Sequence, residues 1–238
     1  MTVVAVQVFG VALAIEVADP SLIPAVRDLL PPGYEAIPAT PGLPRFALAA
    51  GEAAAALEEL DGRLRAHIAE HARHHVFVHA GVVAVGGRAI VLPAPTHAGK
   101  TALVVALLQA GAVYYSDEFA VLDGTGRVLP YAKPLTVRSA DGRRSSRVTA
   151  ASLGAATGDG PAAVAMIAAT RHVSGATWAP QPRSAADGTM LLLSHAGQAR
   201  GDPARVLESV SRAAEGAIVL EGPRGEAAAA AAALLAAL

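Results

Sequence analysis

The 238-residue chain contains no cysteine. This absence excludes disulfides, thiolate metal ligands and thiol nucleophiles, and it fits a protein of the reducing cytoplasm. Aromatic residues make up only 4% of the chain although apolar residues reach 53%, so we expect a core of aliphatic side chains and alanine. The length allows one large domain or two small ones with a sizeable core.

The sequence also lacks an excess of basic over acidic residues, or of acidic over basic ones. The formal net charge is −1, so the composition gives no indication of a nucleic-acid partner. The final "AAAAAAALLAAL" is shorter than the roughly 20 residues that cross a bilayer. The first residues, "MTVVAVQVFGVALAI", lack the basic start and cleavage site of a signal peptide. The sequence therefore predicts a cytoplasmic protein without a membrane partner.

Residues 1–75 predict a small α/β module. Val3 to Val17 is rich in β-branched residues and predicts a strand or hairpin. Residues 21–30 predict a helix that ends at Pro31, and the Pro/Gly-rich residues 31–45 predict a loop or extended segment. A long helix is expected from Gly51, with an apolar face formed by Leu57, Leu60, Leu64 and Ile68.

Residues 76–238 predict a second, larger α/β domain. "VFVHAGVVAVGGRAIVLPA" reads as two strands joined by a Gly86-Gly87 turn. Helical and strand-like patterns then alternate, with helices after Gly99, from Pro203 and at the C-terminus, and with a buried strand at 163–170. Residues 139–161 are expected to form a loop. This alternation favours an α/β class with a sheet covered on both faces.

"VLPAPTHAGKTALVVALL" (91–108) resembles a phosphate-binding loop between a strand and a helix. The pattern G-x-x-x-x-G-K-[ST] is met by Gly99, Lys100 and Thr101, whereas Ala94 stands where the first glycine is expected. Such a loop turns backbone N–H groups and a helix N-terminus toward phosphate oxygens. The candidate nucleotide-binding residues are Ala94, Pro95, Thr96, His97, Ala98, Gly99, Lys100 and Thr101. Alanine can replace the glycine at low cost only if its φ is negative.

An acidic pair, Asp117-Glu118, follows the next predicted strand. One helix and one strand separate it from Lys100, so the carboxylates can emerge beside the loop at the end of the sheet where ligands collect. A carboxylate there can hold Mg²⁺ together with the Thr101 hydroxyl, or accept a proton from a hydroxyl. The alternative is a pair of solvated turn acids.

Three further features admit more than one interpretation. Arg171 follows a buried strand and can reach a phosphate or be an ordinary surface arginine. The cluster Arg138, Arg143, Arg144 and Arg147 is either a surface loop or an arginine lid. "HIAEH" (67–71), followed by His74 and His75, matches a zinc-protease motif, but no downstream glutamate ligand is evident, so we expect a solvated helix end.

Together these motifs resemble the core of HPr kinase/phosphorylase and its smaller relatives. His79 matches a histidine on the strand before the loop, Lys100-Thr101 matches the loop itself, and Asp117-Glu118 matches an acidic pair that is usually Asp-Asp. "YAKPL" resembles a [KR]-P segment of the smaller relatives, so the resemblance covers roughly residues 76–137. It implies a P-loop kinase core of the HPr-kinase type, preceded by the small N-terminal α/β module.

The resemblance also implies an activity, namely ATP- and Mg²⁺-dependent transfer of the γ-phosphoryl group to a serine hydroxyl of a protein or peptide. His79 and Asp117 would flank that hydroxyl, with Asp117 as base, and Glu118 would assist the metal. The glycine-rich segment used for phosphorolysis is not recognisable, so phosphorylase activity is not expected. A nucleotide-binding sensor or scaffold with a degenerate loop and a small-molecule kinase are the alternatives. A homo-oligomer is left open.

Overall fold

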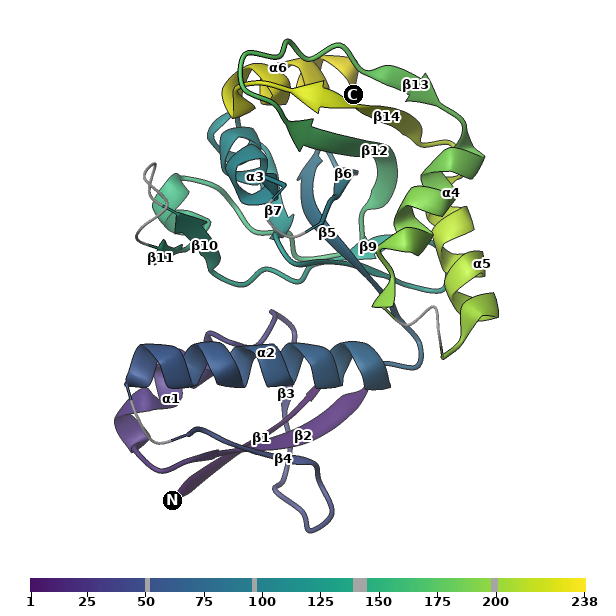
Figure 1. Cartoon of the computed structure of the whole chain (residues 1–238). Helices are drawn as coiled ribbons and strands as arrows, with labels where there is room; N and C mark the ends of the chain where they lie inside the picture. The colour runs from purple at the N-terminus through teal and green to yellow at the C-terminus, as the bar shows by residue number, and fades with distance from the viewer. Residues whose placement is uncertain (50–51, 96–97, 139–144, 198–200) are drawn as a thin grey trace. The chain divides into compact units, whose positions relative to one another are not determined.

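The computed structural model describes residues 1–49, 52–95, 98–138, 145–197 and 201–238. The chain divides into two compact units, Met1–His75 and Val76–Leu238 (Figure 1). Within the described ranges, no helix combines the length and the apolar character that crossing a membrane requires.

The first unit is a four-stranded sheet in the order β3-β1-β2-β4 with α-helices. Strands β1 (Thr2–Val8) and β2 (Val11–Val17) form the predicted hairpin, which turns at Phe9-Gly10. Helix α2 (Ala53–His71) buries the four predicted apolar positions, so both expectations are confirmed. The predicted helix at 21–30 is shorter: a 3₁₀ turn, η1 (Pro20–Leu22), leads into α1 (Ile23–Arg27). The short strand β3 (Glu35–Ala36) interrupts the predicted loop, and β4 (Arg45–Ala47) follows it.

The second unit is built on an eight-stranded mixed sheet in the order β13-β14-β12-β6-β5-β8-β9, with β7 also paired to β5. Its strands are β5 (Val76–Val85), β6 (Arg88–Pro93), β7 (Val113–Ser116), β8 (Phe119–Leu122), β9 (Val128–Leu129), β12 (Ala163–His172), β13 (Gln181–Arg183) and β14 (Ile218–Arg224). The predicted turn at Gly86-Gly87 joins β5 to β6. The protein is therefore of the α/β class, as expected.

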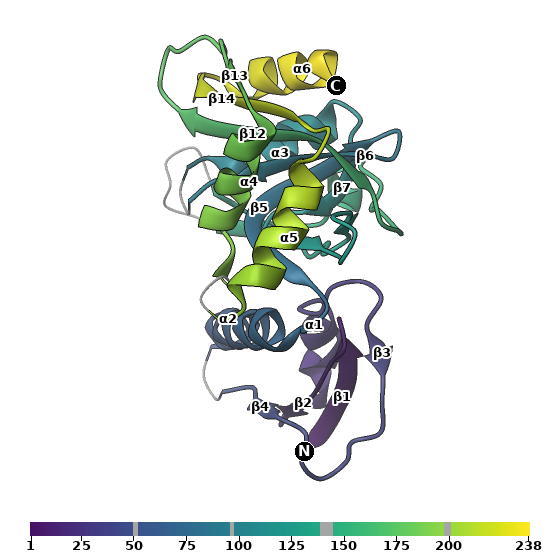
Figure 2. The ribbon, with the colours of Figure 1, turned by 90° about the vertical axis from the view of Figure 1, so that its right-hand side faces the viewer.

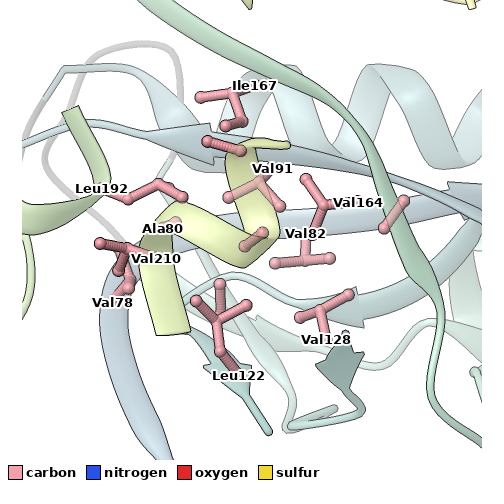
Figure 3. Packing of buried hydrophobic residues seen from close by; sticks show 14 of the residues in the cluster. Val78, Ala80, Val82, Val91, Leu122, Val128, Val164, Ile167, Leu192 and Val210 are labelled. Atoms are coloured by element: carbon pink, nitrogen blue, oxygen red, sulfur yellow. The ribbon is translucent and has the colours of Figure 1, made fainter. Parts of the chain in front are cut away.

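Helices cover both faces of this sheet. Helices α3 (Lys100–Gln109) and α6 (Ala227–Ala237) lie on one face, and α4 (Ala185–Ser194) and α5 (Pro203–Ala214) lie on the other (Figures 1 and 2). Aliphatic side chains fill both interfaces because alternate residues of each strand point to opposite faces. Figure 3 shows one of them, where Val78 and Val82 of β5 pack with Val210 of α5 and Leu192 of α4.

Two segments of the second unit differ from expectation. The predicted loop at 139–161 contains β11 (Ser145–Val148), which pairs with β10 (Leu135–Arg138), and the 3₁₀ turn η2 (Ala151–Leu153). Strand β11 was not predicted because most of its residues are polar and have a weak strand propensity. Helix α4 was not expected, and it is set by a capping box between Ser184 and Asp187 that precedes a short apolar run.

The strand directions bring several chain segments to one edge of the sheet. Strands β6, β12 and β14 are parallel, so their carboxyl ends lie together. Strands β7 and β8 both run antiparallel to β5, which itself runs antiparallel to β6. The turn between β7 and β8 and the start of α3 after β6 therefore meet around the middle of β5.

Candidate functional site

The site is centred on the N-terminus of α3. Gly99 precedes the helix with φ +82°, a left-handed conformation that glycine adopts readily, and no side chain of the described residues caps this end. The first N–H groups of an α-helix have no acceptor within the helix, and the helix dipole makes this end positive. This end of α3 can therefore receive an anion.

The segment before α3 tolerates the missing first glycine. Ala94 is buried, and among the described residues only Phe9 has a positive φ without being glycine, so the expected φ of Ala94 is confirmed. The N–H of Ala98 donates to the carbonyl of Pro95 at 3.3 Å. Thr96 and His97 lie outside the described residues.

Lys100 is held against β5 rather than extended into solvent. Its Nζ lies 2.8 Å from Nε2 of His79, and its residue is partly buried. Because an ammonium group can only donate, Nε2 accepts this bond and carries no proton. Gly81 allows the contact: a Cβ built there would lie 2.7 Å from Cγ2 of Val104 and 3.1 Å from Cγ of Lys100. His79 lies two residues earlier on the same face of β5.

Thr101 connects the helix to the acidic pair. Its hydroxyl donates a 2.6 Å hydrogen bond to Oδ2 of Asp117. The carboxylate is buried, with 8% of the residue exposed, and among the described residues its Oδ1 has no hydrogen-bond partner. Burial raises the pKa of Asp117 to about 7, against the opposing effects of Thr101 and Lys100 and with a smaller upward effect from Glu118. Asp117 is thus a carboxylate with one oxygen held and one available to a proton or cation.

A serine turn sets the acidic pair in place. The hydroxyl oxygen of the buried Ser116 accepts hydrogen bonds from the N–H groups of Glu118 and Phe119. The carbonyl of Glu118 accepts from the N–H of Ala80, so the backbone rejoins β5 directly after the pair. The acidic pair therefore forms a hydrogen-bonded turn between β7 and β8. Glu118 itself is partly exposed.

The predicted residues His79, Lys100, Thr101, Asp117 and Glu118 thus come together. Within the described residues, no group of three or more His, Asp or Glu side chains could hold a metal ion. The donors that do converge, a hydroxyl and carboxylate oxygens, are of the type that Mg²⁺ takes while keeping several waters.

Arg224 is the main residue of this region that the sequence did not indicate. Its Nη2 donates to the carbonyl of Gly99 at 2.7 Å, and the Cβ of His172 also lies near Gly99. His172 and Arg224 are register partners at the carboxyl ends of β12 and β14. The candidate Arg171 is exposed, and strand alternation places its side chain on the face opposite to that of His172.

The other sequence candidates show ordinary environments. His67 packs its ring on Phe46 and His71, while His71 and His74 are exposed, and the described residues contain no metal-binding group there. Arg147 is exposed, whereas Arg143, Arg144 and the side chain of Arg138 lie outside the description.

No family model, curated protein or solved structure shows a significant match to this chain. The chemistry of the site therefore rests on its own residues.

Proposed function

We propose that the protein is an ATP- and Mg²⁺-dependent kinase that transfers the γ-phosphoryl group to a hydroxyl, most readily a serine of a protein or peptide. One observation carries the proposal. Two hydrogen bonds, Lys100–His79 and Thr101–Asp117, bring together the Lys100 ammonium, the N-terminus of α3 and a buried carboxylate. Among the described residues, no side chain caps this helix end and Oδ1 of the carboxylate has no partner.

The converging residues fit the two parts of Mg·ATP. The N-terminal N–H groups of α3 and the Lys100 ammonium supply the positive potential that phosphates require. The Thr101 hydroxyl and Asp117 would hold Mg²⁺, assisted by Glu118, and the orphaned Oδ1 of Asp117 is the observation that supports this fit. The ion would neutralise charge on the transferring phosphates.

The protein's own part in the transfer is binding and proton acceptance. The acceptor oxygen forms a bond to the γ-phosphorus, the bond from that phosphorus to the bridging oxygen breaks, and the hydroxyl proton passes to Asp117. The role of Asp117 as base rests on its position beside the N-terminus of α3 and on its Oδ1, which has no hydrogen-bond partner among the described residues. Neutral His79 holds Lys100 and lies on the strand beside the acidic pair.

Calorimetry with ATP, in the presence and absence of Mg²⁺, tests the binding half of the proposal. We expect saturable binding that Mg²⁺ strengthens. Labelled ATP with a lysate of the source organism then tests transfer, and a labelled protein or peptide band is expected. Binding without transfer to any macromolecule or small molecule would favour a nucleotide sensor, and label appearing only in small molecules would favour a small-molecule kinase.

A further inference from the structure

Arg224 is a buried cation that forms no ion pair with a carboxylate of the described residues. Only 2% of the residue is exposed, and its two hydrogen bonds go to carbonyl oxygens, those of Gly99 at 2.7 Å and Gly225 at 2.9 Å. Its Nε is buried without an acceptor, and no ion pair to it is found among the described residues. A buried charge of this kind is costly unless something else on the protein or a ligand compensates it.

The bond to Gly99 sets the direction of the next N–H group. The peptide unit between Gly99 and Lys100 is planar and trans, so its C=O and N–H point in opposite directions. Arg224 fixes the carbonyl on its own side of the chain. The N–H of Lys100, the first of α3, therefore points within the same plane toward the opposite side of the chain. The same carbonyl accepts only a long 3.3 Å bond from the N–H of Leu103, so Arg224 is its shorter partner.

The charge of Arg224 adds to the same end of α3. The guanidinium lies against the residue that precedes the helix, at the end where the helix dipole is positive. Burial lowers the pKa of Arg224, while Glu226 opposes that shift. An anion at this helix end would compensate the buried charge of Arg224.

We infer that Arg224 is a positioning residue of the phosphate site. It orients the Gly99–Lys100 peptide by binding the Gly99 carbonyl, on the side opposite to the N–H of Lys100. It also supplies a buried charge that makes the site selective for multiply charged phosphates. The inference rests on the proposed function, because it takes the N-terminus of α3 as the place where phosphate binds. The inference adds to the site a residue of β14, the last strand, which lies 123 positions after Thr101 in the sequence.

Titration of the full chain with inorganic pyrophosphate at constant ionic strength tests this role without requiring catalysis. We expect Arg224→Met to weaken pyrophosphate binding by on the order of 10-fold or more, and Arg224→Lys, which keeps the charge and one donor, to recover part of that loss. Arg183→Met is the matched control: it removes an exposed arginine of β13, paired with Glu221, and should leave the affinity unchanged.

A second readout separates positioning from packing. In a transfer assay with saturating acceptor, Arg224→Lys should raise KM for ATP more than it lowers kcat, because it alters ground-state phosphate binding. Wild-type affinity for pyrophosphate in a folded Arg224→Met variant would overturn the inference. So would failure of Arg224→Lys to fold, which would make Arg224 a structural residue. If wild type binds neither pyrophosphate nor ATP, the proposed function itself fails.

Discussion

Oδ2 of Asp117 accepts a 2.6 Å hydrogen bond from Thr101, while Oδ1 of the same buried carboxylate has no partner in the part of the chain that the structure describes. This asymmetry has a thermodynamic consequence. Burial raises the pKa of Asp117 to about 7 from 3.8, so the folded protein binds a proton more tightly than the unfolded chain does. The stabilising contribution of Asp117 to the unfolding free energy is fully present below pH 4 and is lost as the pH rises through 7.

Asp117→Asn should therefore stabilise the ligand-free protein at pH 8 and change little at pH 4. The shift corresponds to at most about 4 kcal/mol. Urea unfolding at both pH values measures the difference. Asp187→Asn is the control of opposite sign, since hydrogen bonds from Ser184 lower the pKa of Asp187 and its loss should destabilise at high pH. Equal effects of Asp117→Asn at pH 4 and pH 8 would show that this carboxylate is not perturbed.

Lys100→Ala should weaken ATP binding by on the order of 10- to 100-fold, because it removes the ammonium group that lies beside His79 at the N-terminus of α3. Calorimetry measures the change. Arg183→Ala removes an exposed cation from the same unit and should leave the affinity within a factor of about two. Unchanged ATP affinity in Lys100→Ala would place the nucleotide elsewhere.

Gly81→Ala should damage the site through packing alone. The new Cβ would lie 2.7 Å from Cγ2 of Val104, so the Val104 side chain, α3 or the strand must shift. We expect a loss of about 1–3 kcal/mol in unfolding free energy together with weaker nucleotide binding. Gly160→Ala is the control, since its Cβ would meet no atom within 4 Å. Wild-type stability in Gly81→Ala would mean that the close approach of α3 to β5 is not required.

Ser116→Ala should release the turn that presents the acidic pair. Two backbone N–H groups lose their acceptor, at a cost of about 1–3 kcal/mol, and phosphoryl transfer should fall more than ATP affinity. Ser116→Thr keeps the hydroxyl and should restore much of both. The comparison of kcat with KM for the two variants measures this, and a change confined to ATP affinity would contradict the assigned role of the turn.

Most residues of the candidate site could be predicted from short local sequence patterns. Gly99-Lys100-Thr101 and Asp117-Glu118 are short contiguous motifs, and the strands and helices around them follow hydrophobic periodicity, so their convergence could be predicted. The close packing at Gly81 could also have been inferred from the sequence, because a glycine inside a β-rich run often marks the close approach of another backbone. Ser116 carried a weaker signal as a hydroxyl residue before an acidic turn.

Arg224 could not be predicted in the same way. Its role depends on β14 lying parallel to β12, and on the register that pairs it with His172, which no local pattern encodes. Arg171 was the candidate because it follows the buried run directly, but only one of two adjacent strand residues can face the loop. Strand β11 was missed for a related reason, since its exposed serines acquire strand geometry only by pairing with β10.

The most direct test of the account compares phosphoryl transfer and nucleotide binding in Asp117→Asn, using the acceptor that wild type labels. Asparagine keeps the shape and removes the base, so we expect Mg·ATP still to bind while transfer falls by on the order of 10²-fold or more. Transfer at the wild-type rate by Asp117→Asn would contradict the central claim that this buried carboxylate takes the acceptor proton.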